Sequence, residues 1–203
     1  MSAAEFKFKD DREAVLRAVG KSWPAKPAPD LPRPPARSAE ELIRQFMQAA
    51  VENAASAERL SGAREIPAAT ARVLRDRQLP PALICVEEFC GLDWQGAGIA
   101  AECRVPADAD AAGISGVAAA AADCGAMLAR GGHLELAASL LPPHCIAVLR
   151  AADIAADLNE VFARAEFVPG ANAIFCGPSR TADIEQTLVL GMHGPLSVHI
   201  LVV

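Results

Sequence analysis

The segment with the clearest capacity for chemistry runs from Gly177 to Glu185 and reads Gly-Pro-Ser-Arg-Thr-Ala-Asp-Ile-Glu. An apolar strand-like run precedes a Gly-Pro turn, hydroxyl side chains follow, and acids occupy the first turn of a helix predicted over residues 181–190. Free backbone N–H groups at such a helix N-terminus attract anions, and an arginine beside them can grip a carboxylate or phosphate. The alternative is structural, with a threonine cap and acids that complement the helix dipole. The candidate ligand-binding residues here are Ser179, Arg180, Thr181, Asp183 and Glu185.

A second candidate follows the same predicted helix, in Gly191-Met192-His193-Gly194-Pro195. Glycine just after a helix and proline shortly beyond it form a common stop signal. We expect His193, beside Gly194, to lie in an exposed loop where it can transfer a proton or bind an anion. A structural loop histidine is the alternative.

A third candidate is the run Ala122-Asp123-Cys124-Gly125-Ala126. It predicts a tight bend between two short strands, with Asp123 directed into a cleft. Ordinary turn chemistry is the alternative interpretation.

Composition and spacing argue against several other chemistries. Tyrosine is absent, which excludes a tyrosine acid or base. The lysines all fall within the first 26 residues, so Schiff-base and P-loop nucleotide chemistry are not expected. The six cysteines form no CxxC pair and the four histidines form no HxH or HxxxH pair. We therefore expect no metal, and no iron–sulfur cluster or other cofactor, on this chain. A net charge of −6 offers no basic face for nucleic acid.

The apolar content points to a cytoplasmic protein rather than a membrane protein. Of the 203 residues, 52% count as hydrophobic, but alanine supplies much of that share. The longest apolar run, residues 117–122, is far shorter than the roughly 20 residues that span a bilayer. The first residues lack the apolar core of a signal peptide. We expect the cysteines to be reduced thiols packed as small hydrophobes.

The elements that would position these candidates alternate between strand and helix. Residues 1–37 are predicted to form a short helix and a proline-rich linker, and residues 38–203 the folded domain. Ser38 and Glu41 form a capping box that opens a helix to about Leu60. The pattern predicts an α/β fold, with a Rossmann-like, mostly parallel sheet flanked by helices. Further helices are predicted from Pro67, from Gly131 to Pro142, and over 153–165 and 181–190, and strands over 82–86, 118–122, 126–129, 145–149, 173–176 and 197–203.

The order of motifs in the C-terminal half resembles the LUD-domain family, from about residue 40 to residue 203. The motifs that carry the resemblance are Ser-Leu-Leu-Pro-Pro-His (139–144), Asp-Ile (153–154) and the two glycine-proline motifs described above. One departure stands out, because members usually carry Ala-Glu-Thr-Gly-Thr where this chain has Ala-Asp-Cys-Gly-Ala (122–126).

This resemblance implies a fold like that of the NagB/RpiA/CoA-transferase group. It also implies a place in a bacterial three-protein system that oxidises L-lactate to pyruvate, whose two partner proteins carry iron–sulfur clusters. By position, it assigns ligand-facing roles to Ser179, Thr181, Asp183, Glu185, His193 and Gly194.

Three functional hypotheses follow. The first is a non-redox subunit of the lactate-oxidising system that binds a ligand or docks a partner and has no activity alone. The second is a stand-alone enzyme of the same fold group that acts on a CoA ester, a sugar phosphate or a folate. For CoA transfer, Glu185 is the candidate nucleophile. The third is a regulatory module that binds a small carboxylate or phosphate through Arg180. A homo-oligomer is compatible with each.

Overall fold

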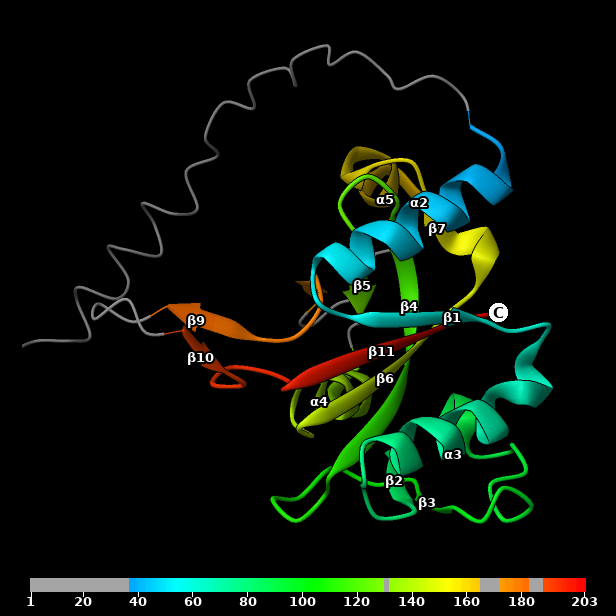
Figure 1. The fold of residues 1–203 in the computed structure, drawn as a ribbon, viewed down its shortest axis with the longest axis vertical. Helices are drawn as coiled ribbons and strands as arrows, with labels where there is room; N and C mark the ends of the chain where they lie inside the picture. Colours follow the sequence, from blue (N-terminus) through cyan, green and yellow to red (C-terminus); the bar gives the residue numbers. More distant parts are fainter. Residues whose placement is uncertain (1–36, 130–131, 165–171, 183–187) are drawn as a thin grey trace, which may run out of the picture. The chain divides into compact units, whose positions relative to one another are not determined.

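A nine-stranded, mostly parallel sheet forms the centre of the fold (Figure 1). The structure, a computed structural model, describes residues 37–129, 132–164, 172–182 and 188–203. The predicted N-terminal helix and nearly all of the linker lie outside these ranges. The main path of the sheet consists of parallel neighbours, in the order β1 (Ser56–Arg59), β11 (Ser197–Val202), β6 (His144–Leu149), β4 (Ala112–Ala121), β2 (Ala82–Cys85) and β3 (Ala100–Glu102).

Three of the remaining strands join the sheet beside the C-terminal part of β4, and the other two form a separate pair. The short β7 (Ile154–Ala155) runs parallel to β4, whereas β5 (Ala126–Ala129) pairs antiparallel with both β4 and β8 (Ala173–Phe175). A separate antiparallel pair consists of β9 (Arg180–Ala182) and β10 (Leu188–Leu190). The predicted α/β class with a mostly parallel sheet is confirmed.

Strand β11 lies between β6 and β1 and presents two different faces. Val198, Ile200 and Val202 are buried in one cluster with Phe46 of helix α2 (Ala39–Glu52). On the opposite face, Leu201 packs in the cluster that contains helix α3 (Ile66–Asp76). Both faces of a parallel sheet are normally covered by helices, and this part of β11 follows that rule.

Helix α2 begins as predicted but ends early. The Ser38 side chain accepts a hydrogen bond from the Glu41 backbone N–H, and the Ser38 N–H donates to the Glu41 carboxylate, so the capping box is confirmed. The helix ends at Glu52 rather than near Leu60, because residues Ser56–Arg59 pair with β11 instead. The hydrogen bonds that this segment makes to β11 outweigh its helix propensity. No helix among the described residues has the length and apolarity needed to cross a bilayer.

The predicted helix over 153–165 is shorter than expected. A 3-10 turn spans Ala151–Asp153, Ile154 and Ala155 form β7, and helix α5 covers only Leu158–Arg164. Val161 is buried, whereas Phe162 is 46% exposed.

The predicted helix over residues 181–190 is wrong at both of its described ends. Residues Arg180–Ala182 are extended and pair with Leu188–Leu190, with Thr181 opposite Val189. Both of those residues are β-branched and favour extended backbone. Because no helix begins at Thr181, the anion site predicted at a helix N-terminus has no basis in the backbone there.

The cysteines are all free thiols but are not uniformly buried. Burial raises the pKa of the Cys145 thiol to about 12, as expected of a thiol that packs as a small hydrophobe. Cys90, Cys103 and Cys176 are exposed, which contradicts the prediction of uniform packing.

The alanine and glycine content of β4 lets helix α4 (His133–Leu140) approach the sheet closely. A Cβ atom added to Gly113 would lie 2.3 Å from the Ala138 carbonyl oxygen and 2.9 Å from Pro142 Cγ. Ser115 and Ser139, one on each element, share a buried hydrogen bond of 2.5 Å between their hydroxyl oxygens. Small residues therefore set the distance between this helix and the strand that it covers.

We predict that Gly113→Ala lowers the free energy of unfolding by about 1–3 kcal/mol, because the added methyl group meets a backbone carbonyl that cannot move aside. Gly91→Ala is the matched control, since nothing lies within 4 Å of its added Cβ. Urea denaturation of both variants measures the difference. Equal stability of the two variants would contradict the close-packing explanation.

Candidate functional site

Ser179 joins the two glycine-proline motifs. Its backbone N–H donates to the Pro195 carbonyl at 2.8 Å, and its carbonyl accepts from the Gly191 N–H at 3.0 Å. The His193 N–H donates to the Ser179 hydroxyl oxygen at 3.3 Å. The fold therefore brings Ser179 and His193 together, and their role in ligand binding stays a prediction.

Gly194 belongs to the same junction, because a Cβ added there would lie 3.4 Å from the Ser179 Cβ. His193 and Gly194 lie in a loop that leads directly into β11, and His193 is exposed. We call the group Ser179, His193, Gly194 and Pro195 the motif junction.

The other residues predicted for this site are not placed in it. Arg180 is exposed and begins β9, and Thr181 follows it in the same strand rather than capping a helix. Asp183 and Glu185 lie outside the described residues. Of the first candidate segment, only Ser179 has described contacts with the second.

Asn53, which follows helix α2, connects the third candidate segment to Gly177. The Asn53 side-chain amide donates to the Cys124 carbonyl at 2.7 Å. A Cβ added to Gly177 would lie only 2.3 Å from the Asn53 carbonyl oxygen. The bend at residues 122–126 is confirmed, with Gly125 at a φ of 69°. Asp123, however, is exposed rather than directed into a cleft. Burial raises the pKa of the neighbouring Cys124 thiol.

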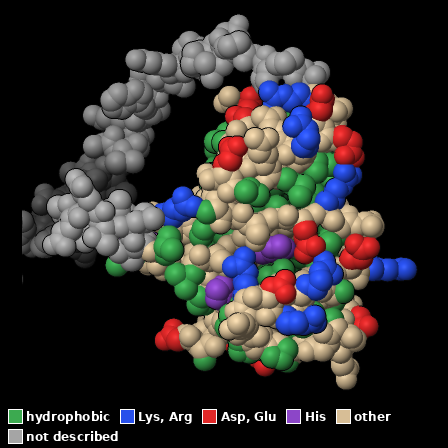
Figure 2. Space-filling model, viewed as in Figure 1, with side chains coloured by type: hydrophobic (Ala, Val, Ile, Leu, Met, Phe, Trp, Pro, Cys, Tyr) green, Lys and Arg blue, Asp and Glu red, His purple; other side chains and the backbone are tan. Residues whose placement is uncertain are grey.

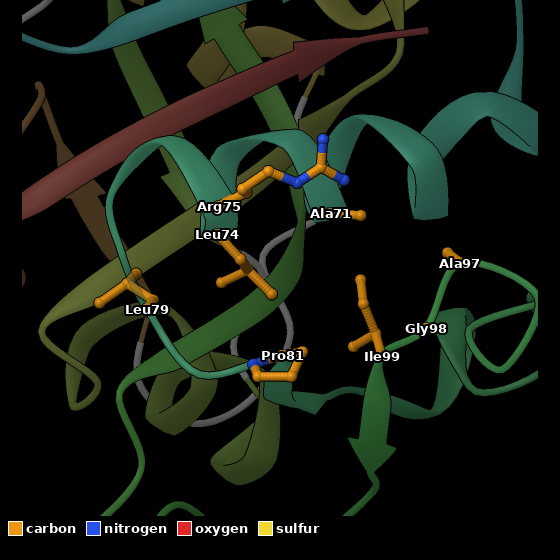
Figure 3. Close-up of a pocket in the computed structure, with 8 residues that line it drawn as sticks. All are labelled: Ala71, Leu74, Arg75, Leu79, Pro81, Ala97, Gly98 and Ile99. Carbon is orange, nitrogen blue, oxygen red and sulfur yellow. The ribbon is translucent and has the colours of Figure 1, made fainter.

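A hollow of about 270 Å³ lies beside helix α3, against the segment 97–99 (Figure 3). Its lining is apolar except for Arg75, whose guanidinium points away from Leu74, Pro81 and Ile99 in the close-up. Polar groups do not converge there, so this hollow is a poor candidate for binding a charged ligand.

A group of polar side chains occupies the α3-side face of the sheet where β1, β6 and β11 begin. We call this group the polar patch; its residues are Ser56, Glu58, Arg77, His144, Ser197 and His199. The parallel register places Ser197 beside His144, and Ser56 beside His199. Figure 2 shows histidine, arginine and acidic side chains gathered at the surface over these strands.

The hydrogen-bond directions within the polar patch follow from its chemistry. His199 Nε2 lies 3.2 Å from Glu58, and a carboxylate only accepts, so Nε2 carries the proton. In a neutral ring, Nδ1 then accepts from the Ser56 hydroxyl at 2.7 Å. The Ser56 oxygen in turn accepts from Arg77 Nη2 at 3.1 Å, and Arg72 donates to Glu58 at 2.8 Å. The chain of donors therefore runs from Arg77 to Glu58.

Burial lowers the pKa of both histidines in the patch, so each ring stays neutral at a lower pH than an exposed histidine does. Burial is the main cause that lowers the pKa of His199, and Glu58 opposes it. Burial lowers the pKa of His144 too, with a further contribution from the positive charge of Arg77. His144 Nδ1 and the Ser197 hydroxyl oxygen are 2.7 Å apart.

We did not predict the polar patch from the sequence. Its signal is the alternation of polar and apolar residues in Ser197-Val198-His199-Ile200 and in Ser56-Ala57-Glu58. The second run falls within the helix predicted from Ser38 to about Leu60, and its alternation of polar and apolar residues is too short to stand out there.

Comparison with known proteins identifies the domain that contains these sites. A model of the LUD domain matches residues 43–203, which include both the motif junction and the polar patch. The chain belongs to the LUD-domain family. A solved structure described as a duf162 family protein from Deinococcus radiodurans shares its fold, with a TM-score of 0.56 and 20% sequence identity. That similarity covers 82% of this chain and 99% of the other.

Curated relatives of the LUD-domain chain match it over a shorter stretch. It is 36% identical over 72 residues to lactate utilization protein C of Halalkalibacterium halodurans, a match that covers 32% of this chain and 31% of the relative. It is 35% identical over 72 residues to lactate utilization protein C of a Geobacillus species, covering 32% of this chain and 30% of the relative. The matched stretch spans about a third of the length of each relative.

We predict that Gly177→Ala destabilises the LUD domain by more than Gly98→Ala. Both glycines have positive φ, 68° and 74°, so alanine is strained at either position by about 1 kcal/mol. Only at Gly177 does the new methyl group also meet the Asn53 carbonyl. Urea denaturation of the two variants separates strain from clash. Equal losses would show that Gly177 and Asn53 are not in close contact.

We predict that the LUD domain loses stability as the pH falls from about 7.5 to 5.5, partly through His199. Because the folded pKa of His199 is lowered, the unfolded chain binds the proton more tightly, and stability falls as pH drops below the unfolded pKa of about 6.5. Thermal denaturation across this range should show a smaller loss in His199→Gln than in the wild type. The same loss in both proteins would exclude this contribution.

Proposed function

We propose that the chain is a component of a bacterial L-lactate utilization system, and that it acts in the cytoplasm with iron–sulfur partner proteins. The observation that carries the proposal is the 72-residue match to lactate utilization protein C in two organisms. The LUD domain over residues 43–203 supports it.

The role that the geometry supports best is a non-redox one, in which the chain binds a ligand or docks a partner. Oxidation of L-lactate to pyruvate removes two electrons and two protons, so it needs an electron acceptor. The motif junction offers a hydroxyl group, an imidazole and backbone groups, which can bind and orient a substrate but do not accept electrons. We expect the acceptor on the partner proteins.

The stand-alone alternatives have less support. The CoA-transferase hypothesis places the nucleophile at Glu185, which lies outside the described residues, and no observation on the described part of the chain favours it. The regulatory hypothesis relies on Arg180 at a helix N-terminus, and that residue begins a strand instead.

We predict that the purified chain alone does not oxidise L-lactate, whereas its complex with co-purified partners does. Formation of pyruvate and reduction of an artificial electron acceptor, each with and without the partners, measure this directly. Deletion of the gene should also abolish growth on L-lactate, and the full chain should restore it.

Two outcomes would contradict the proposal. One is robust oxidation of L-lactate by the isolated chain. The other is normal growth of the deletion strain on L-lactate as the carbon source. Growth of the same strain on glucose is the control for this experiment.

A further inference from the structure

We propose that the polar patch binds a small monocarboxylate, whose charge is held by Arg77 and whose remaining polar oxygen contacts His144. The site lies in the LUD domain and includes His144, which ends one of the family motifs, but it contains none of the residues to which the resemblance assigns ligand-facing roles. The inference draws on the proposed function only in the choice of L-lactate and pyruvate as the first probes.

The first argument is the unbalanced charge of Arg77. Its side chain is half-buried at the end of helix α3, and among the described residues no carboxylate lies within 4 Å of its guanidinium. The side-chain hydrogen bond that it makes within the described part of the chain is to a neutral partner, the Ser56 hydroxyl. A partly buried cation without an anion is costly, so an anionic ligand beside it would be stabilised.

The nearby acid does not remove this imbalance. Glu58 is the carboxylate of the patch, but Arg72 at 2.8 Å already balances its charge, and His199 donates to it at 3.2 Å. Arg77 is separated from Glu58 by Ser56 and His199 along the chain of hydrogen bonds. One arginine thus remains to meet one negative charge.

The second argument is the supply of uncommitted donors next to Arg77. Its Nη2 donates to Ser56, which leaves Nη1 and Nε without a described acceptor. The fork geometry of a guanidinium suits the two oxygens of a carboxylate. His144 uses Nδ1 toward Ser197, and its Nε2 has no hydrogen-bond partner among the described residues. Arg77 is close enough to contribute to the lowered pKa of this histidine.

The third argument is the place of the patch on the sheet. Ile146 and Leu201, farther along β6 and β11, are covered in the cluster that contains α3. At the starts of the same strands the same face carries His144, Ser197 and His199, all partly exposed. Polar side chains from several strands therefore reach solvent where a parallel sheet is normally covered.

The charges favour a monoanion over a phosphate dianion. The patch contributes a single unbalanced positive charge, both imidazoles are neutral near pH 7, and Glu58 lies on the same face. A dianion would bring a second negative charge that no described group of the patch offsets.

The experiment is a binding titration of the full chain by calorimetry, with L-lactate, pyruvate, propionate and inorganic phosphate as probes. The variants are Arg77→Gln and Arg77→Lys, and the matched control is Arg75→Gln, on the same helix but lining the apolar hollow. We expect Arg77→Gln to weaken binding of L-lactate or pyruvate about tenfold, and Arg77→Lys by less, since it keeps the charge but loses the fork. Arg75→Gln should bind as the wild type does.

A second readout is independent of the folding of the variants. In the wild type, saturating pyruvate should shift the imidazole NMR signals of His144 and raise the pKa of that ring, because an anion arrives beside it. The signals of His133 serve as the control.

Several results would overturn the proposal: no binding of any carboxylate to the wild type, unchanged affinity in Arg77→Gln, a larger loss in Arg75→Gln, or phosphate binding at least as tight as pyruvate. These results are distinct from failure of the proposed function. A chain that binds carboxylates through Arg77 but does not support growth on L-lactate would refute that function and leave this site in place.

Discussion

The parallel pairing of β11 between β6 and β1 is the constraint on which both candidate sites depend. Its register gives one face of the strand to Phe46 and helix α2, and the other to helix α3 and the polar patch. The loop that leads into β11 contains three residues of the motif junction, and the fourth, Ser179, donates its backbone N–H to the Pro195 carbonyl. A slip of one residue in this strand would bury His199 and expose Ile200, so apolar burial on one face holds the polar groups in place on the other.

Close packing at glycine residues is a second constraint on the fold. Gly113 lets helix α4 reach the sheet, and Gly177 lets the chain pass against Asn53 at the end of helix α2. These glycines thus matter for the short distances that they permit between elements. Alanines occur in all three clusters of the core.

The sequence predicted those parts of the fold whose signals are local. The capping box at Ser38, the proline-bounded strand at 82–86 and the apolar final strand are confirmed, as is the LUD-domain family. The failures are places where tertiary pairing outweighs local preference: Ser56–Arg59 and Arg180–Ala182 become strands only because a partner strand is present. Arg77 could not be singled out, since its unbalanced charge is a property of the folded surroundings.

The central claim of this account is that the register of β11 builds a carboxylate site around Arg77. A crystal structure of the full chain grown with pyruvate tests it most directly. The account predicts pyruvate in the polar patch, with its carboxylate within hydrogen-bond distance of the Arg77 guanidinium and an oxygen facing His144. Pyruvate bound at the motif junction or in the hollow beside Arg75, with the patch unliganded in the same crystal, would contradict it.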